Sequence, residues 1–417
     1  MNLLREDIEL LAPVGSYESL QAAFHAHADA VYLGVGKLNM RSLSSGNFSE
    51  TDLLKISDQC RKHHVKCYVT LNAVMYDDDL DEVEKILAAC KEAGVDAVIA
   101  SDIAVMQKAR ELGLNVHLST QVNISNTESL KFFSRYADAV VLARELNLQQ
   151  VKRIYENITS QNITGPQGKP IRLEMFVHGA LCMAISGKCY LSLHQYNHSA
   201  NRGECFQVCR RSYIVTDKET QSQLEIDNEY IMSPKDLCTI EFLDKILFAG
   251  ARLLKIEGRA RGPEYVKIVT LSYHKAIDAI LEGKFTDSLK KELLSELSKV
   301  YNRGFWDGYY LGRKLGEWSN SYGSIATKKK IYVGKVINYY SKAKVVEVSI
   351  ETGSIAQGDT LLFIGPTTGV EELTVNELQV NDIPSRQAEK GQHCTIPSTI
   401  QLRRSDKVYK WVDNADL

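Results

Sequence analysis

Short apolar, β-branched runs alternate with amphipathic stretches at a steady spacing along the first 260 positions of the chain. Within 78–93, for example, Val83 and Leu87 fall on one side of a helix and charged residues on the other. This alternation is typical of parallel strands with helices packed outside them. The apolar runs predict eight strands, at 8–13, 30–35, 66–72, 97–102, 116–121, 139–144, 173–178 and 252–257.

Eight strand–helix units are the number that closes a TIM-type (β/α)8 barrel, and we predict this α/β fold. An open, doubly wound sheet is the alternative that the same pattern permits. The barrel-like domain is expected to span 1–325, with a cysteine-rich insertion at about 181–250 after the seventh strand and a helical extension at about 263–318. Because the insertion is far longer than an ordinary barrel loop, we expect it to hold a hairpin of its own around 213–230.

The pattern changes after a polar stretch at 319–330, which we interpret as a linker. Beyond it, short strand-like runs are separated by turn residues, at 331–336, 343–350, 358–363, 372–380 and 392–396. These runs predict a small C-terminal all-β barrel domain over 331–417.

Composition narrows the class of protein only slightly. A chain of 417 residues with 44% hydrophobic content can bury a substantial core. Its start does not resemble a signal peptide and no apolar run reaches the roughly 18 residues of a membrane helix, so we predict a cytoplasmic protein without a membrane segment. The net charge of -2 confines any nucleic-acid binding to a local patch.

Four of the nine cysteines lie within 28 positions, at Cys182, Cys189, Cys205 and Cys209. Thiols stay reduced in the cytoplasm, so this cluster predicts a bound metal rather than disulfides. Structural zinc sites use two close ligand pairs, whereas iron–sulfur clusters accept wider gaps. Because only the last two cysteines form a close pair, the spacing favours an iron–sulfur cluster and leaves zinc as the alternative.

Polar residues stand at the ends of six of the eight predicted strands. In a barrel of this type the chemistry belongs to the C-terminal ends of the strands. One such residue is often only a solvated strand end, but their repetition predicts a polar pocket, over which the cysteine loop would lie. The residues concerned are Asn72, Asp102, Ser119 with Gln121, Arg144 with Glu145, His178, and Lys255 with Glu257 and Arg259.

Two segments, Glu174-x-Phe-x-His178-Gly-Ala-Leu-Cys182-x6-Cys189 and Lys255-Ile-Glu-Gly-Arg259, closely resemble signature motifs of the collagenase-like peptidase family U32. The resemblance extends over nearly the whole chain. It implies an RNA hydroxylation protein with a 4Fe-4S cluster on the four cysteines. Within the family, this chain is most similar to the branch that uses prephenate to hydroxylate the wobble uridine of tRNA to 5-hydroxyuridine.

Other functions within the same resemblance stay open. One is hydroxylation of a cytidine in 23S ribosomal RNA. A second is true proteolysis, although the chain lacks the His-Glu-x-x-His and Gly-x-Ser-x-Gly motifs of common hydrolases. A third is a non-catalytic role beside a related partner chain.

The resemblance singles out Arg41, Gln121, His178, Lys255, Glu257 and Arg259 without giving each a role. We predict that Arg259 and Lys255 hold prephenate or a related small carboxylate, with Arg41, Gln121 and Arg144 as further substrate contacts. His178, Glu257 and Lys255 are the candidate catalytic residues because each can exchange a proton.

Three arginines flank the cysteines, at Arg202, Arg210 and Arg211. We expect them to contact RNA phosphates while a flipped uridine enters the pocket. Ion pairing within the loop is the alternative for all three.

Overall fold

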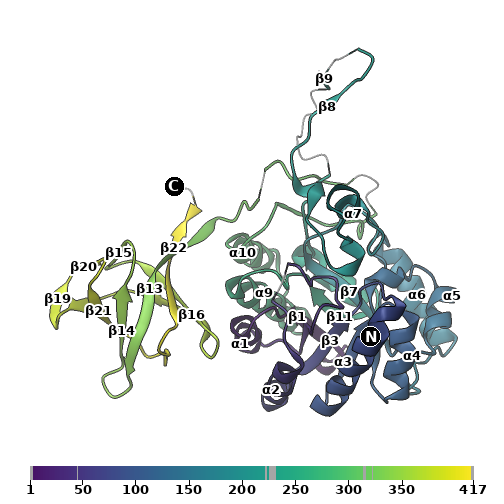
Figure 1. Ribbon diagram of the computed structural model, residues 1–417, viewed down its shortest axis with the longest axis horizontal. Coiled ribbons are helices and arrows are strands. Elements are labelled where there is room, and N and C mark those ends of the chain that lie inside the picture. The colour runs from purple at the N-terminus through teal and green to yellow at the C-terminus, as the bar shows by residue number, and fades with distance from the viewer. Residues whose placement is uncertain are drawn as a thin grey trace.

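The computed structural model describes residues 3–44, 46–220, 223–224, 232–312, 316–321 and 323–414. Eight parallel strands form a closed barrel, because β11 pairs with both β1 and β7 at the two ends of the series. The barrel prediction is therefore confirmed over the doubly wound alternative (Figure 1). The strands are β1 (Glu9–Pro13), β2 (Ala30–Gly34), β3 (Lys66–Leu71), β4 (Ala97–Ala100), β5 (Val116–Leu118), β6 (Ala139–Val141), β7 (Arg172–Gly179) and β11 (Ala251–Ile256).

Helices follow the strands and cover the outside of the barrel (Figure 1). Local sequence sets their ends: the side chain of Asn147 accepts a hydrogen bond from the first turn of α6, and Gly94 ends α3 with a left-handed backbone. The barrel helices are α1 (Tyr17–His25), α2 (Glu50–Lys62), α3 (Leu80–Ala93), α4 (Ile103–Glu111), α5 (Thr127–Phe133), α6 (Leu148–Ser160), α8 (Leu243–Phe248) and α9 (Pro263–Leu281), and α10 (Asp287–Ser298) packs on α9.

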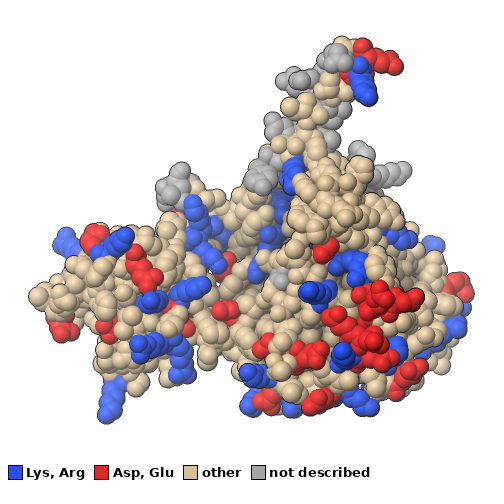
Figure 2. All heavy atoms as spheres, in the orientation of Figure 1, with Lys and Arg blue, Asp and Glu red and all other residues tan. Residues whose placement is uncertain are grey.

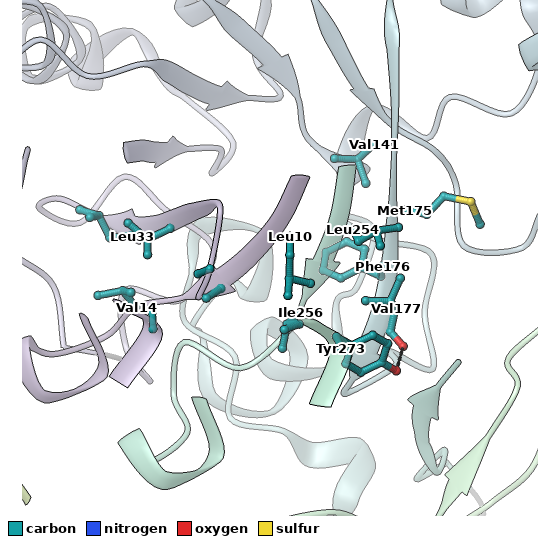
Figure 3. Close-up of a cluster of buried hydrophobic side chains, with 14 of the residues drawn as sticks. Leu10, Val14, Leu33, Val141, Met175, Phe176, Val177, Leu254, Ile256 and Tyr273 are labelled. Carbon is teal, nitrogen blue, oxygen red and sulfur yellow. Dashed lines mark hydrogen bonds between the residues drawn. The ribbon is translucent and has the colours of Figure 1, made fainter. Parts of the chain in front are cut away.

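The strands are buried on both faces. Outward-facing side chains such as Leu10 and Leu254 pack against the helices, and Tyr273 of α9 donates a hydrogen bond of 2.7 Å to the backbone oxygen of Val177 (Figure 3). Inward-facing side chains, among them Leu11 and Tyr68, fill the barrel interior. Burial of each large apolar side chain stabilises the folded state by roughly 1.5–3 kcal/mol. Because the strands are buried on both faces, both sets of side chains are apolar and the strands appear as nearly continuous apolar runs.

The insertion after β7 contains helix α7 (Leu191–Tyr196), the hairpin β8 (Val215–Thr216) and β9 (Gln223–Leu224), and strand β10 (Asp236–Cys238), which pairs antiparallel with β7. The expected hairpin is thus present, although 221–222 and 225–231 lie outside the described residues. In Figure 1 the insertion lies over one end of the barrel and the hairpin projects away from it. The insertion was expected to run to about 250, and α8, at the end of that range, packs on β11 as a barrel helix.

The aromatic segment that follows α10 packs beneath the insertion. Strand β12 (Phe305–Trp306) extends the sheet by pairing with β10. Tyr310 is buried and donates a hydrogen bond of 2.8 Å to the backbone oxygen of Phe176. The segment therefore fixes the position of β7, the strand that leads into the cysteines.

The C-terminal region is all β, as predicted, and its strands pair antiparallel. Its main sheet has the order β17-β16-β22-β13-β14-β21-β18-β19 and a separate apolar core. The strands are β13 (Lys328–Tyr340), β14 (Val345–Ile350), β16 (Thr360–Gly365), β17 (Gly369–Thr374), β18 (Leu378–Val380), β19 (Ile383–Ser385), β21 (His393–Pro397) and β22 (Lys407–Asp413), with β15 (Ser354–Ala356) and β20 (Gln387–Glu389) as a small second sheet. Helices α1 and α9 of the barrel pack against β17.

Two details of this region differ from the prediction. The expected strand 372–380 is the end of β17 followed by β18. The lysines at 328–330 are not part of a linker but begin β13, where Lys328 pairs with Asp413 and Lys330 with Glu264. Cross-strand pairing thus gave a strand conformation to a segment whose composition alone resembled a linker.

Among the described residues, no helix has the length and apolar character needed to cross a membrane.

Candidate active site

A cavity opens at the C-terminal ends of the barrel strands, between the barrel and the insertion. The insertion contributes Ser186 and Gly187 to its wall, and the loop after β3 contributes Asn72. With Asn72, nine of the residues singled out from the sequence meet in this wall, the others being Arg41, Ser119, Gln121, Arg144, Cys182, Lys255, Glu257 and Arg259.

Arg41 and Glu257 form an ion pair at the cavity wall. The Nη2 and Nε atoms of Arg41 donate to one carboxylate oxygen of Glu257 at 2.8 and 3.1 Å. Burial by itself would raise the pKa of Glu257, but the positive charges of Arg41, Arg144 and Arg259 together lower it. Glu257 is therefore a carboxylate at neutral pH and can accept a proton but not donate one.

Lys255 forms a buried ion pair with Glu174 of the neighbouring strand β7. Its Nζ atom donates to Glu174 at 2.7 Å, and both side chains are buried inside the barrel. Burial would raise the pKa of Glu174, but Lys255 and His117 lower it to about 2. Lys255 therefore already has a carboxylate partner before any substrate binds.

Glu174 and His117 were not among the predicted site residues. His117 lies 3.5 Å from the second carboxylate oxygen of Glu174, and both are buried. The available signal was a charged residue at position 174 inside an otherwise apolar strand, which is a rare placement for a carboxylate.

Arg259 and Arg144 differ from the other cations, because neither forms an ion pair with a described carboxylate. Arg259 donates to the side-chain oxygens of Asn39 at 3.1 Å and Thr70 at 2.8 Å. Burial lowers the pKa of Arg259 to about 10, so the group stays charged at neutral pH.

Arg144 stacks over the ring of Phe176 at 3.9 Å and donates to the backbone oxygen of Ala180 at 3.1 Å. Its Nε atom is buried without a hydrogen-bond partner. A buried donor without a partner is costly, so this atom is suited to an anionic acceptor in the cavity.

Gln121 connects the barrel to the insertion. Its side-chain oxygen accepts hydrogen bonds from Ser119 and, at 3.4 Å, from Asn72. Gly187 packs so closely that a Cβ atom there would lie 2.7 Å from the Gln121 side chain, and its φ of +75° also favours glycine. The cysteine loop is therefore seated directly on the end of β5.

His178 is not brought to the cavity wall. Its ring lies among Tyr265, Tyr273 and Phe305, and its Nδ1 atom is 3.4 Å from the Tyr273 hydroxyl. Burial, with a smaller contribution from the charge of Arg261, lowers the pKa of His178 to about 3. The ring is therefore neutral and enclosed, in contrast to Lys255 and Glu257, which do line the cavity.

The four clustered cysteines are all free thiols. Cys182 is exposed at the cavity wall and the other three are partly buried. Burial raises the pKa of Cys209, Arg210 lowers it, and the negative charges of Cys182, Cys205 and Cys189 raise it further. The Cys209 thiol therefore lies close enough to the other three cysteines to be influenced by them.

Four free thiols of one loop are the donor set that an iron–sulfur cluster takes. The predicted ligands thus fit that group in chemistry. Over the described part of the chain, no group of three or more His, Cys, Asp or Glu side chains is arranged to hold a single metal ion.

The three arginines of the insertion have separate environments. Arg202 is paired with Asp79 at 2.6 Å, and Arg210 is largely buried, where it donates to the backbone oxygens of Leu181 and Pro234. Arg211 is exposed and lies over the ring of Tyr196. The alternative considered from the sequence was ion pairing within the loop, but the partner of Arg202 lies outside the loop and the printed partners of Arg210 are uncharged. Of the three arginines, Arg211 presents its charge to solvent.

The fold and the site together define a class: a TIM-type barrel protein with a cationic mouth covered by a four-cysteine insertion. The model of peptidase family U32 matches residues 15–320, and the chain belongs to this family.

Its relatives carry two kinds of name. The chain is 54% identical to a protein named collagenase from Porphyromonas gingivalis, over 97% of this chain and 98% of the relative. It is 33% identical to a tRNA hydroxylation protein of Bacillus subtilis, over 96% and 93% of the two chains. It is also 32% identical to a 23S rRNA 5-hydroxycytidine synthase of Escherichia coli, over 76% of this chain and 47% of that one. The family thus includes RNA hydroxylation proteins and collagenase-named proteins.

Proposed function

We propose that this protein is an RNA-hydroxylating enzyme that uses prephenate to convert the wobble uridine of tRNA to 5-hydroxyuridine. The observation that carries the proposal is the pair of guanidinium groups, Arg144 and Arg259, that face the cavity without carboxylate partners among the described residues. Arg41 is neutralised by Glu257 and Lys255 by Glu174. Two positive charges remain, which match the two carboxylates of prephenate.

Four of the lining residues have roles that follow from their contacts. Arg144 and Arg259 bind the carboxylates through charge-assisted hydrogen bonds, which are stronger in a cavity shielded from water. Glu257, held ionised by Arg41, is the proton acceptor. The amide of Gln121 lies beside them and orients a polar group of the substrate.

Cys182, Cys189, Cys205 and Cys209 would hold a 4Fe-4S cluster, with zinc as the alternative metal. A bound cluster supplies one-electron transfer or a Lewis-acidic iron next to the cavity. Cys182 belongs to both the cavity wall and the cysteine set, so a group held there would border the substrate. We expect anaerobically purified protein to be brown, with iron and sulfide present. Colourless protein containing zinc would contradict the cluster.

The proposed reaction is tested by nucleoside analysis of tRNA from a strain that lacks this protein. We expect 5-hydroxyuridine derivatives to be lost and to be restored by the wild-type chain. Arg259→Ala should fail to restore them while retaining iron, because the variant leaves the cysteines in place. Arg261→Ala is the matched control, since Arg261 stacks on Tyr301 and does not line the cavity. Full activity of Arg259→Ala would contradict the role of this residue, and unchanged tRNA would redirect the proposal to the ribosomal cytidine.

Proteolysis is the second candidate, because a relative named collagenase is 54% identical to this chain. It would use Cys182, the one exposed thiol at the cavity wall. His178, the nearest histidine in sequence, is enclosed by aromatic rings and does not line the cavity with Cys182. Release of peptides from gelatin by purified protein, lost in Cys182→Ala, would favour this candidate over RNA hydroxylation.

A further inference from the structure

The insertion exposes an unusual amount of apolar surface. Seven of the nineteen exposed large apolar side chains that the structure describes fall within 183–214. They include Tyr190, which is 70% exposed, as well as Tyr196 and Phe206. Single exposed apolar residues are common on soluble proteins, but a contiguous group of them marks an interaction surface.

Two of these side chains, Tyr196 and Phe206, form one structure with His198 and Arg211, which we call the aromatic platform. The Phe206 ring lies 5.0 Å from that of Tyr196 and 5.3 Å from that of His198, and the Arg211 guanidinium lies 5.4 Å over Tyr196. The backbone N–H of Phe206 donates to the hydroxyl of Ser192 at 3.0 Å. This bond ties the cysteine loop to α7, so the platform is built from two segments held together.

The charge of the same segment distinguishes a nucleic acid from other partners. Within residues 182–211, Lys188 and Arg211 present their positive charges to solvent, and Glu204 is the one acidic side chain, whereas the whole chain has a net charge of -2. Glu204 is itself paired with His198. In Figure 2, acidic side chains gather near the N-terminus and α3, and the surface around α7 is mostly uncharged. A polyanion is therefore repelled from that side of the barrel and accepted at the insertion.

We propose that the aromatic platform stacks the unpaired bases of a single-stranded RNA loop next to the nucleotide that enters the cavity. Bases stack on aromatic rings and on arginine planes whatever their sequence, and RNA loops are recognised mainly in this way. The insertion that carries the platform also lines the cavity through Cys182, Ser186 and Gly187. One bound strand can therefore contact the platform and present a flipped base to the cavity. This inference rests on the proposed function and names the surface that binds its substrate.

The test is fluorescence anisotropy of a labelled tRNA anticodon stem–loop with the full-length protein. The double variant Tyr196→Ala with Phe206→Ala should bind at least about tenfold more weakly, because each stacked base contributes roughly 1–3 kcal/mol. The ring-preserving pair Tyr196→Phe with Phe206→Tyr should bind like the wild type. Phe248→Ala on α8, which removes an exposed ring outside the insertion, should also leave binding unchanged. Iron content measured for each variant excludes damage to the neighbouring cysteines.

The outcomes separate this inference from the proposed function. Wild-type protein that binds the RNA, together with a double variant that binds equally well, would overturn the platform and leave the proposed function standing. Wild-type protein that binds no RNA would overturn both. A double variant that keeps its RNA affinity but loses self-association in sedimentation analysis would identify the platform as a protein contact and overturn the inference. Arg259→Ala should retain RNA binding while losing hydroxylation, since it lies in the cavity.

Discussion

The barrel mouth and the insertion contribute side chains to the same cavity but hold them in different ways. At the mouth, Lys255 and Glu257 stand on or next to β11, which is hydrogen-bonded to a strand on each side. In the insertion, Tyr196 and Phe206 stand on a helix of six residues and on a loop, and both rings are exposed. The difference indicates a division of labour: a rigid scaffold positions charges for a small anion, and a loop-built surface meets a larger partner.

The charged side chains of the barrel mouth and of the insertion also differ in how deeply they are buried. Charges at the mouth are buried and depend on fixed partners, as the Lys255–Glu174 pair shows. In the insertion, the charge of Arg211 is solvated, although Arg202 is ion-paired and Arg210 is partly buried. A change at the mouth should therefore alter the free energy of unfolding strongly, whereas a change in the insertion should mainly alter binding.

The largest effect is expected for Glu174→Ala. This variant leaves the ammonium of Lys255 buried without its carboxylate, and we expect a loss of about 3–5 kcal/mol in the free energy of unfolding. Urea denaturation measures it. Glu156→Ala is the control, because Glu156 is an exposed partner of Lys152 on α6 and should change stability by less than about 1 kcal/mol. Equal stability of the two variants would show that the mouth does not depend on the buried pair.

A smaller effect is expected where the insertion contacts the mouth. Gly203 has a φ of +91°, and a Cβ atom there would lie 2.2 Å from the backbone oxygen of Asn39. The side-chain oxygen of the same Asn39 accepts a hydrogen bond from Arg259. Gly283 is the matched control: its φ is +70° but no atom lies within 4 Å of the added Cβ. Both alanine variants carry the left-handed backbone cost of about 1–2 kcal/mol. Gly203→Ala should lose roughly 1–3 kcal/mol more in the free energy of unfolding than Gly283→Ala. Thermal denaturation should show this loss as a lower midpoint. Identical thermal midpoints of Gly203→Ala and Gly283→Ala would mean that the insertion can move to accommodate the added methyl group without destabilising the barrel.

The smallest effect concerns pH. The folded state holds His178 neutral with a pKa of about 3, below the unfolded value of 6.5, so the unfolded state binds more protons between these values. Stability is therefore complete above pH 6.5 and falls as the pH is lowered, by about 1.4 kcal/mol at pH 5.5. Urea denaturation at several pH values should show this slope, and His178→Gln should remove it. His393→Gln, at an exposed site in the C-terminal sheet, should keep the slope. A slope that survives in His178→Gln would assign the effect to other groups.

Sequence patterns predicted the barrel well because each of its strands is buried on both faces and appears as an apolar run. They failed where pairing overrides composition, as in the lysines at 328–330, which resemble a linker but begin β13. They also failed to separate Arg202 and Arg210 from Arg211, because all three have the same charge and flank the same cysteines. Asp79, which pairs with Arg202, is far from it in sequence.

The amino-acid sequence by itself determined the eight strand–helix units, the strand-end positions of Gln121, Arg144 and Lys255, and the four-thiol set, since these follow from periodicity and spacing within short segments. Tertiary structure alone decided which charges are neutralised. The pairs that leave Arg144 and Arg259 as the cavity cations without a described carboxylate partner join residues that are distant along the chain, such as Arg41 with Glu257. The physical reason is that hydrophobic periodicity acts locally, whereas the partner of a buried charge is chosen only when barrel closure brings distant strands together.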